Sequence, residues 1–299
     1  MANPAPRVSS VHRGSEVIYQ DNHPSEPGRG VRVAELLGPG QRAQHLTVAL
    51  VTLAPGAEVR GHLHPFEESF FVLEGNPAVT IADKQYALVP QDFGFVPVAG
   101  GHAWSNPGAQ AARVLRVYSP QPRPIAGRGV WGVFDAPATP VPASGVPVRE
   151  LDPTHYHVGH FDESDMAPPG SISMPGYHGA NVQDVQIRMM VDELIGAVQH
   201  TTFIVQFTPT GKPGGAAREH YHPFEEIYYL TAGAAMTSFD GEHTEVRAGD
   251  LVFAPVGASH GFSPVGSEPV RWLEVQAPVP PASNGFTFHN DWSQASNLG

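Results

Sequence analysis

The 299-residue sequence contains no cysteine, which excludes disulfides, thiolate metal ligands, iron–sulfur clusters and cysteine nucleophiles. It has no apolar run near the ~18 residues of a membrane span, and its first ten residues lack the apolar segment of a signal peptide. Basic residues are few: 17 Lys and Arg stand against 29 Asp and Glu, and the net charge is -12. A nucleic-acid or anionic-membrane surface is therefore not expected. These features favour a cytoplasmic protein that acts on a small-molecule partner.

Glycine and proline are abundant, with 32 and 31 residues, and they separate short runs rich in Val, Phe, Tyr, Leu and Thr. This pattern is typical of antiparallel sheet, so the predicted fold is all-β. Strands are expected at 45–53, 69–74, 78–81, 85–88, 93–96, 113–118, 201–207, 227–231, 235–239, 244–247, 251–254 and 271–276. Helical periodicity is weak, and the apolar stretches 33–38 and 191–196 fit either a strand or a turn.

One set of residues occurs twice with the same spacing. His62, His64, Glu68 and His102 recur as His220, His222, Glu226 and His260, each 158 residues later. Ten further identities keep this offset, from Glu35/Glu193 to Pro120/Pro278. The repeat spans 32–120 and 190–278 without a gap. Because this period exceeds the ~20 to 50 residues of solenoids and propellers, it indicates two fused copies of one domain.

The repeat divides the chain into five expected parts. An N-terminal arm covers 1–30, the two domains cover 31–122 and 188–280, and a C-terminal tail covers 281–299. The segment 123–187 is rich in Pro, Gly, Ser and Asp and is expected to be a linker with some ordered structure. His155, His157 and His160 in this linker imitate a metal motif, but no carboxylate follows at the spacing of the repeats, so a solvated linker is favoured. The acidic run at 162–165 fits a solvated turn, with a mobile lid as the alternative.

The repeated residues have the spacing of a metal site. Side chains alternate along a strand, so His62 and His64 face the same side and both can reach one ion. Pro65 then favours a turn that places Glu68 on the next strand. His102 lies 34 residues beyond Glu68, a distance that short antiparallel strands can span to return to the same edge. The second copy repeats the argument. Three imidazoles and one carboxylate suit divalent Fe or Mn, with Ni, Co and Zn as alternatives.

Side chains with the same alternation are candidates for substrate binding. Arg60 and Arg218 share the parity of the histidine pairs and would point inward to grip a carboxylate or an enolate oxygen, although neighbouring glycines fit a solvent-facing loop equally well. Phe70 and Tyr228 share the parity of the glutamates and are expected to line the cavity, where a tyrosine near an open coordination site could also donate a proton.

These motifs resemble those of bicupins in the cupin superfamily. The first cupin motif, G-x5-H-x-H-x3-E-x6-G, is complete in both halves, beginning at Gly56 and at Gly214. The second motif, G-x5-P-x-G-x2-H-x3-N, departs from the family in the first half at Gln91 and Ala99 and in the second at Pro264. The departures leave the ligands intact and put loop geometry in doubt, more so for the first half. The resemblance implies two tandem double-stranded β-helix (jelly-roll) barrels.

The resemblance also implies several activities, among them dioxygenases, oxalate decarboxylases and oxidases, hydrolases, isomerases and binding proteins. Apolar, aromatic surroundings favour a dioxygenase acting on a small enolic or aromatic compound. Oxalate decarboxylases use a serine-rich lid that carries a glutamate, and this sequence has no convincing copy of it. Glu68 and Glu226 would then serve both as ligand and as proton acceptor. The alternatives are a redox-neutral Mn-dependent hydrolase, decarboxylase or isomerase, and a ligand-binding bicupin without turnover. A homo-oligomer is compatible with this family.

Overall fold

The computed structural model describes residues 9–82, 84–122, 134–135, 158–168, 182–183, 185–207, 216–239, 241–280 and 287–288. Within these ranges the regular structure consists of β-strands and short 3-10 turns, which confirms the predicted all-β fold. No helix in the described part of the chain has the length and apolar character to cross a membrane.

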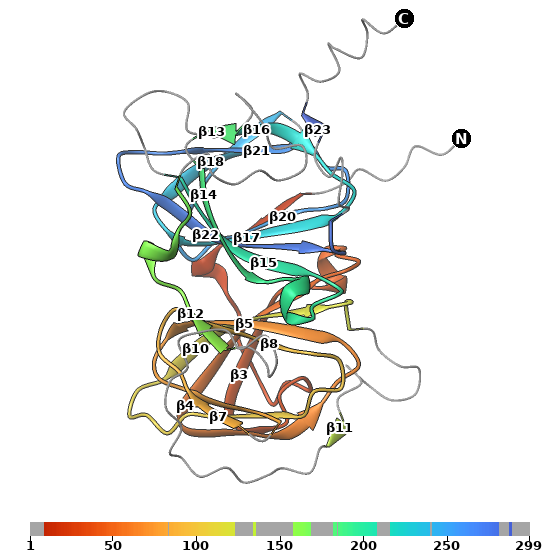
Figure 1. Ribbon diagram of the computed structural model, residues 1–299, viewed down its shortest axis with the longest axis vertical. Helices are drawn as coiled ribbons and strands as arrows, with labels where there is room; N and C mark the ends of the chain where they lie inside the picture. The colour runs from red at the N-terminus through yellow and green to blue at the C-terminus, as the bar shows by residue number, and fades with distance from the viewer. Residues whose placement is uncertain are drawn as a thin grey trace, which may run out of the picture. The chain divides into compact units, whose positions relative to one another are not determined.

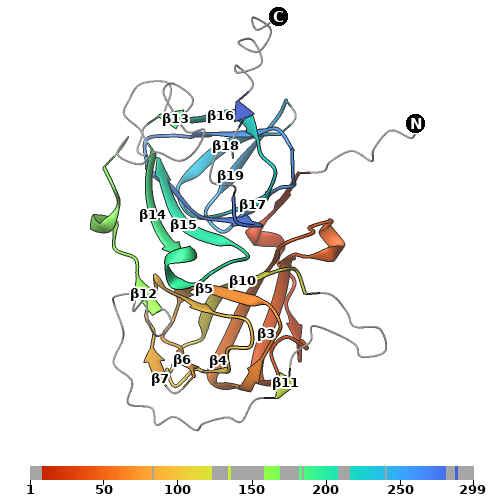
Figure 2. The same cartoon turned by 45° about the vertical axis from the view of Figure 1, so that its right-hand side comes forward.

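The first half forms an 11-stranded sheet with the order β12-β8-β5-β10-β4-β9-β6-β7. Its strands are β2 (Gln20–Asp21), β3 (Gly28–Leu37), β4 (Thr47–Leu63), β5 (Glu67–Glu74), β6 (Ala78–Ile81), β7 (Lys84–Ala87), β8 (Asp92–Val96), β9 (His102–Ser105), β10 (Ala112–Ser119), β11 (Phe134–Asp135) and β12 (Val158–His160). The long β4 belongs to two layers, because its first part pairs with β10 and its last part pairs with β9. The sheet therefore curls on itself around β4 (Figure 2).

The second half is built from two six-stranded sheets. One has the order β1-β20-β17-β22-β15-β14, and the other has the order β13-β16-β21-β18-β19 with β23 on β16 (Figure 1). The strands are β1 (Ser10–His12), β13 (Val182–Gln183), β14 (Val185–Val191), β15 (Thr201–Phe207), β16 (Ala216–Tyr221), β17 (Glu225–Ala232), β18 (Ala234–Phe239), β19 (Glu242–Arg247), β20 (Leu251–Ala254), β21 (His260–Pro264), β22 (Val270–Ala277) and β23 (Thr287–Phe288). With the offset of 158 residues between the two halves, β15 and β16 together correspond to the single long strand β4.

Each half has its own hydrophobic core of β-branched and aromatic side chains. The first core includes Val51, Phe70 and Trp104, and the second includes Tyr228 and Trp272. Alternation along the strands places these residues on one face, and burying each large apolar side chain contributes about 1.5 to 3 kcal/mol. Each sequence repeat therefore builds a hydrophobic core of its own.

The chain exchanges segments between the two compact units. One unit consists of Met1–Glu16, Asp165–Met189 and Thr202–Gly299, and the other of Val17–Ser164 and Met190–Thr201. The N-terminal strand β1 pairs with β20 of the second half. Segment 190–201 joins the first half, where the buried Glu67 carboxylate accepts the backbone N–H groups of Val198 and Gln199 at 2.8 and 3.0 Å.

Two ambiguities of the sequence are resolved by the structure. The stretch 33–37 is the end of β3, whereas β14 ends at Val191 and is followed by a 3-10 turn, Glu193–Ile195. The segment 123–187 was expected to be a linker with some ordered structure, and within it 158–160 form β12 along β8. His160, for which a solvated setting was favoured, lies with its Nδ1 2.7 Å from the buried Asp92. Asp162 is exposed, and Glu163–Asp165 is a 3-10 turn. His155 and His157 lie outside the described residues.

The two departures from the second cupin motif in the first half, Gln91 and Ala99, leave the turns intact. Ala99 adopts a φ of 60°, like Gly257 at 68°, and Gln91 adopts 74°, like Gly249 at 93°. Each half also makes the same turn hydrogen bond: the Ala99 N–H donates to the carbonyl of His64 at 2.9 Å, and that of Gly257 to His222 at 2.8 Å. The concern that non-glycine residues distort these loops is therefore wrong, since the first half keeps the geometry in a strained backbone region.

Replacing Ala99 with glycine is expected to raise the free energy of unfolding by about 0.5 to 1 kcal/mol. A left-handed conformation costs a residue with a Cβ about 1 to 2 kcal/mol, and the greater freedom of glycine in the unfolded chain offsets part of that gain. Urea denaturation measures the change. The control, Ala111→Gly, has an exposed site without a positive φ and should lose stability. Equal losses in both variants would contradict the assigned strain.

Candidate metal centres

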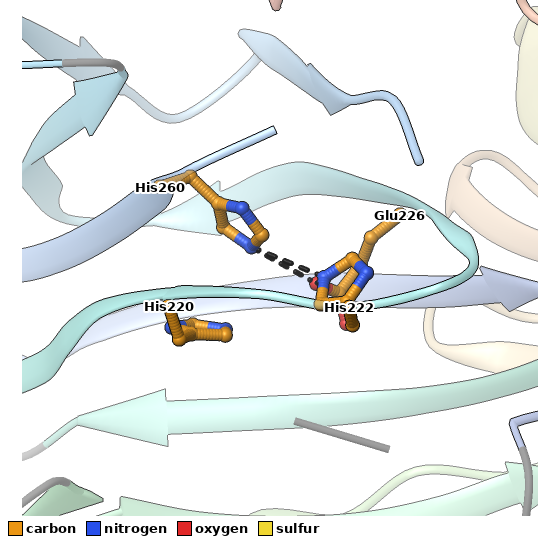
Figure 3. Close-up of side chains that lie close together, drawn as sticks. All are labelled: His220, His222, Glu226 and His260. Atoms are coloured by element: carbon orange, nitrogen blue, oxygen red, sulfur yellow. Dashed lines mark hydrogen bonds and ion pairs between the residues drawn. The ribbon is translucent and has the colours of Figure 1, made fainter. Parts of the chain in front are cut away.

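The second centre comprises His220, His222, Glu226 and His260, all four of them buried (Figure 3). His220 lies on β16 and His260 on β21 of one sheet, His222 directly follows β16, and Glu226 lies on β17 of the other sheet, so the group lies between the sheets. One ligand atom from each residue lies within 4.8 Å of the others. His222 Nε2 is 2.6 Å from Glu226 Oε2, and His260 Nε2 is 3.2 Å from the same oxygen.

The first centre comprises the matching residues His62, His64, Glu68 and His102. The last three form a buried group within 4.8 Å. His62 lies outside this group, although its ring centroid is only 4.2 Å from that of His102 and it is 1% exposed. The structure thus assembles all four predicted residues in the second half and three of the four, with the fourth adjacent, in the first half.

All six histidines are oriented by the backbone. In each ring Nδ1 contacts a carbonyl oxygen two residues away, at distances from 2.7 to 3.0 Å; the carbonyls belong to Arg60, Phe66, Gly100, Arg218, Phe224 and Ala258. Because a carbonyl only accepts, Nδ1 must carry the hydrogen, and in the neutral ring Nε2 is left with a lone pair. Such contacts fix the tautomer and orientation of metal-ligating histidines in known sites.

The electrostatics of both centres suit a cation. Burial and the neighbouring His102 lower the pKa of His62 to about 3, and burial holds the pKa of His220 well below its ordinary value. Burial alone would raise the pKa of Glu226, but His222 and His260 hold it well below the usual range. Imidazole Nε2 atoms and a carboxylate therefore meet in a buried space. This is the donor set of divalent transition metals, and the residues present fit such an ion.

Arg60 and Arg218 do not point toward the centres, and the inward alternative is wrong for both. The β4–β9 register shifts between Val59 and His62, and the β16–β21 register shifts at the matching place. The extra residue of this bulge reverses the alternation, so both arginine side chains are exposed. Their backbone carbonyls instead orient His62 and His220.

Behind the first centre lies a buried ionic network that the sequence analysis missed. Arg116 on β10 is 0% exposed, with its Nε 3.5 Å from Glu68 Oε1 and its Nη1 bonded to Glu26. Its guanidinium carbon lies 4.3 Å from the ring centroid of Trp104. Tyr118 donates its hydroxyl hydrogen to Glu26 Oε1 at 3.0 Å. Burial would lower the pKa of Arg116, but the two glutamates raise it above its ordinary value.

The matching positions behind the second centre carry different chemistry. Glu274 and Gln276 occupy the places of Arg116 and Tyr118. The amide of Gln276 donates to Glu226 Oε1 at 2.6 Å and to Glu274 Oε1 at 3.1 Å. Burial and the nearby Glu226 raise the pKa of Glu274 well above its ordinary value. A cation therefore supports the ligand carboxylate in the first centre, and a neutral amide supports it in the second.

The two aromatic candidates also differ. Phe70 is 3% exposed and packs edge-on against Trp104 at 4.8 Å. Tyr228 is 2% exposed and packs on Phe262, and its hydroxyl donates to Glu226 Oε2 and lies 2.8 Å from His260 Nε2. The sequence contains a signal for the missed residues Arg116 and Tyr118. They occupy alternate positions of the otherwise apolar strand 114–118, so both side chains face the same side of the sheet.

The chain matches known proteins along most of its length. The Cupin domain family matches residues 49–118 and 210–276. Tetracenomycin polyketide synthase protein TcmJ from Streptomyces glaucescens is 32% identical over 124 residues, which cover 41% of this chain and 80% of TcmJ. Oxalate decarboxylase OxdC from Bacillus subtilis is 23% identical over 268 residues, which cover 78% of this chain and 67% of that enzyme.

Gentisate 1,2-dioxygenase from Ralstonia sp is 38% identical over 64 residues, 21% of this chain but only 18% of the dioxygenase. Among solved structures, the formate complex of Lactobacillus farciminis oxalate decarboxylase has a TM-score of 0.63 at 17% identity and covers 97% of this chain and 92% of its own. That likeness extends over both halves and concerns the fold. With two matched cupin domains and a jelly-roll fold in each half, this chain is a bicupin and belongs to the cupin superfamily.

Proposed function

We propose that the chain is a metal-dependent enzyme, a dioxygenase that acts on a small enolic or aromatic compound. The observation that carries the proposal is the second centre, where three backbone-oriented imidazoles and one carboxylate converge between two sheets. Fe or Mn is the expected ion, held by the four residues named for each centre. The similarity to gentisate 1,2-dioxygenase supports an oxygen-using reaction.

The residues around the second centre support the handling of an acidic substrate hydroxyl. A divalent ion bound there would act as a Lewis acid toward the substrate oxygen. Glu226 would accept the released proton, and Gln276 holds its other carboxylate oxygen, Oε1, by a hydrogen bond. In the first centre Glu68 would take the same role, with Arg116 nearby to stabilise its charge.

Aromatic surroundings favour a planar substrate over oxalate. The rings of Phe239 and Tyr228 lie 6.4 and 5.9 Å from that of His260, and Phe262 packs on Tyr228 at 4.4 Å. A dianion such as oxalate would gain most binding energy from hydrogen bonds to a positively charged side chain. The two arginines expected to supply one are exposed, so neither provides it at these centres.

A redox-neutral, Mn-dependent decarboxylase, hydrolase or isomerase is the second candidate. The specific observation in its favour is the similarity to oxalate decarboxylase OxdC, which extends over 78% of the chain. This reaction class would use the same ligands without consuming oxygen.

Oxygen dependence separates the two candidates. The metal-loaded protein should convert at least one compound from a panel of dihydroxybenzoates and enolic hydroxyketones, with oxygen consumed in step, and a chelator should abolish turnover. Product analysis under air and under strict anaerobic conditions makes the measurement, and oxalate serves as the comparison substrate. Equal rates without oxygen, with metal still required, would replace the dioxygenase with the second candidate. Thermal stabilisation by a ligand without any product would indicate a binding protein.

A further inference from the structure

The two centres also differ at the position two residues after the ligand glutamate. Phe70 and Tyr228 are equivalent in the repeat, and each lies two residues after the glutamate on the same face of its strand. Each packs against an equivalent aromatic partner, Trp104 at 4.8 Å or Phe262 at 4.4 Å. The second half therefore adds a phenolic oxygen where the first half has a hydrogen.

This oxygen has the spacing of a ligand atom. Tyr228 Oη is bonded to Glu226 Oε2 and lies 2.8 Å from His260 Nε2. The ligand atoms of His222, Glu226 and His260 are 2.6 to 3.3 Å apart, and all four ligand atoms of the centre lie within 4.8 Å of one another. Two atoms bound ~2.1 Å from one ion at right angles are ~3 Å apart. Tyr228 Oη thus stands among the ligands at the distance of an adjacent ligand.

With a neutral His260, hydrogen bonding accounts for only one of the two contacts of the Tyr228 hydroxyl. His260 Nδ1 donates to the carbonyl of Ala258 at 3.0 Å, which leaves its Nε2 as an acceptor when the ring is neutral. The single hydroxyl hydrogen of Tyr228 can be given to Glu226 or to His260, but not to both. The remaining contact joins two lone pairs, and a cation between them removes that repulsion.

We propose that Tyr228 supplies a fifth protein ligand to the second centre through its phenolic oxygen, whereas the first centre has four protein ligands. This rests on the proposed metal sites. On binding a metal ion, Tyr228 would release its phenolic proton to solvent. An octahedral ion would then keep one open position in the second centre and two in the first. A second anionic oxygen also favours a trivalent ion such as ferric iron in the second centre.

The test is spectroscopic and does not depend on turnover. Protein loaded with ferrous iron and oxidised in air should contain close to two irons per chain and show a phenolate-to-ferric charge-transfer band in visible light. Tyr228→Phe should lose the band and retain both irons, because phenylalanine already fits the matching place in the first half. The control Tyr229→Phe makes the same change on the opposite face of β17 and should keep the band. His64→Ala should also keep it, with about one iron.

Two irons without the band in the wild type, or a band that persists in Tyr228→Phe, would overturn the fifth ligand and leave the proposed function standing. An iron content near zero would overturn both. The iron count therefore distinguishes the two failures.

Discussion

Arg116→Met should lower the free energy of unfolding of the metal-free protein by about 3 to 5 kcal/mol. The arginine is fully buried between Glu26 and Glu68, so its removal leaves two carboxylates in the core without a cation. Methionine keeps much of the side-chain volume, so the loss of unfolding free energy arises more from the missing charge than from poorer packing. Urea denaturation followed by circular dichroism measures it.

The same strand supplies a matched control. Arg113 pairs with Glu74 at 2.5 Å, but the two side chains are 38% and 61% exposed. Such exposed pairs contribute about 0 to 1 kcal/mol, so Arg113→Met should have little effect. The double variant Arg116→Met/Glu26→Gln should recover part of the loss because it removes one uncompensated charge. A loss below about 1 kcal/mol for Arg116→Met would show that the network is not a charged one.

His222→Ala should reduce the metal content from close to two divalent ions per chain to close to one. Its Nε2 lies 2.6 Å from Glu226 Oε2, and alanine removes that donor while the first centre keeps an independent set of ligands. His64→Ala should remove only the other ion, and the double variant should bind almost none. Elemental analysis after reconstitution and dialysis gives the count.

His160→Gln is the control for these variants. His160 lies in the expected linker and contacts Asp92, outside both groups of ligands, so its loss should leave close to two ions. A wild-type content that stays near one after full reconstitution would show that one centre does not bind metal. The first centre is then the candidate for loss, because His62 stands apart from its other three residues.

The strands that could be predicted from the sequence are those with a clear local pattern. Strand stretches such as 201–207 and 251–254 match β15 and β20 in full, because alternating β-branched and aromatic residues between turn residues depend little on the rest of the chain. The short strands β9 and β21 were missed, since four or five residues beginning at a ligand histidine show little alternation. The exchange of β1 into the second half was likewise beyond reach, because pairing between distant strands leaves no local pattern.

By itself, the sequence determined that the protein is two copies of one β domain and which residues of each copy could hold a metal. A constant offset of 158 residues is visible without coordinates, and the spacing of His62, His64 and Glu68 sets their faces within two strands. Only the tertiary structure decided what surrounds them. A bulge turned Arg60 outward, and the pairing of β10 and β22 with their neighbours placed Arg116 behind one glutamate and Gln276 behind the other. Bulges and strand register follow from packing across the whole sheet, so these placements could not be read from one segment at a time.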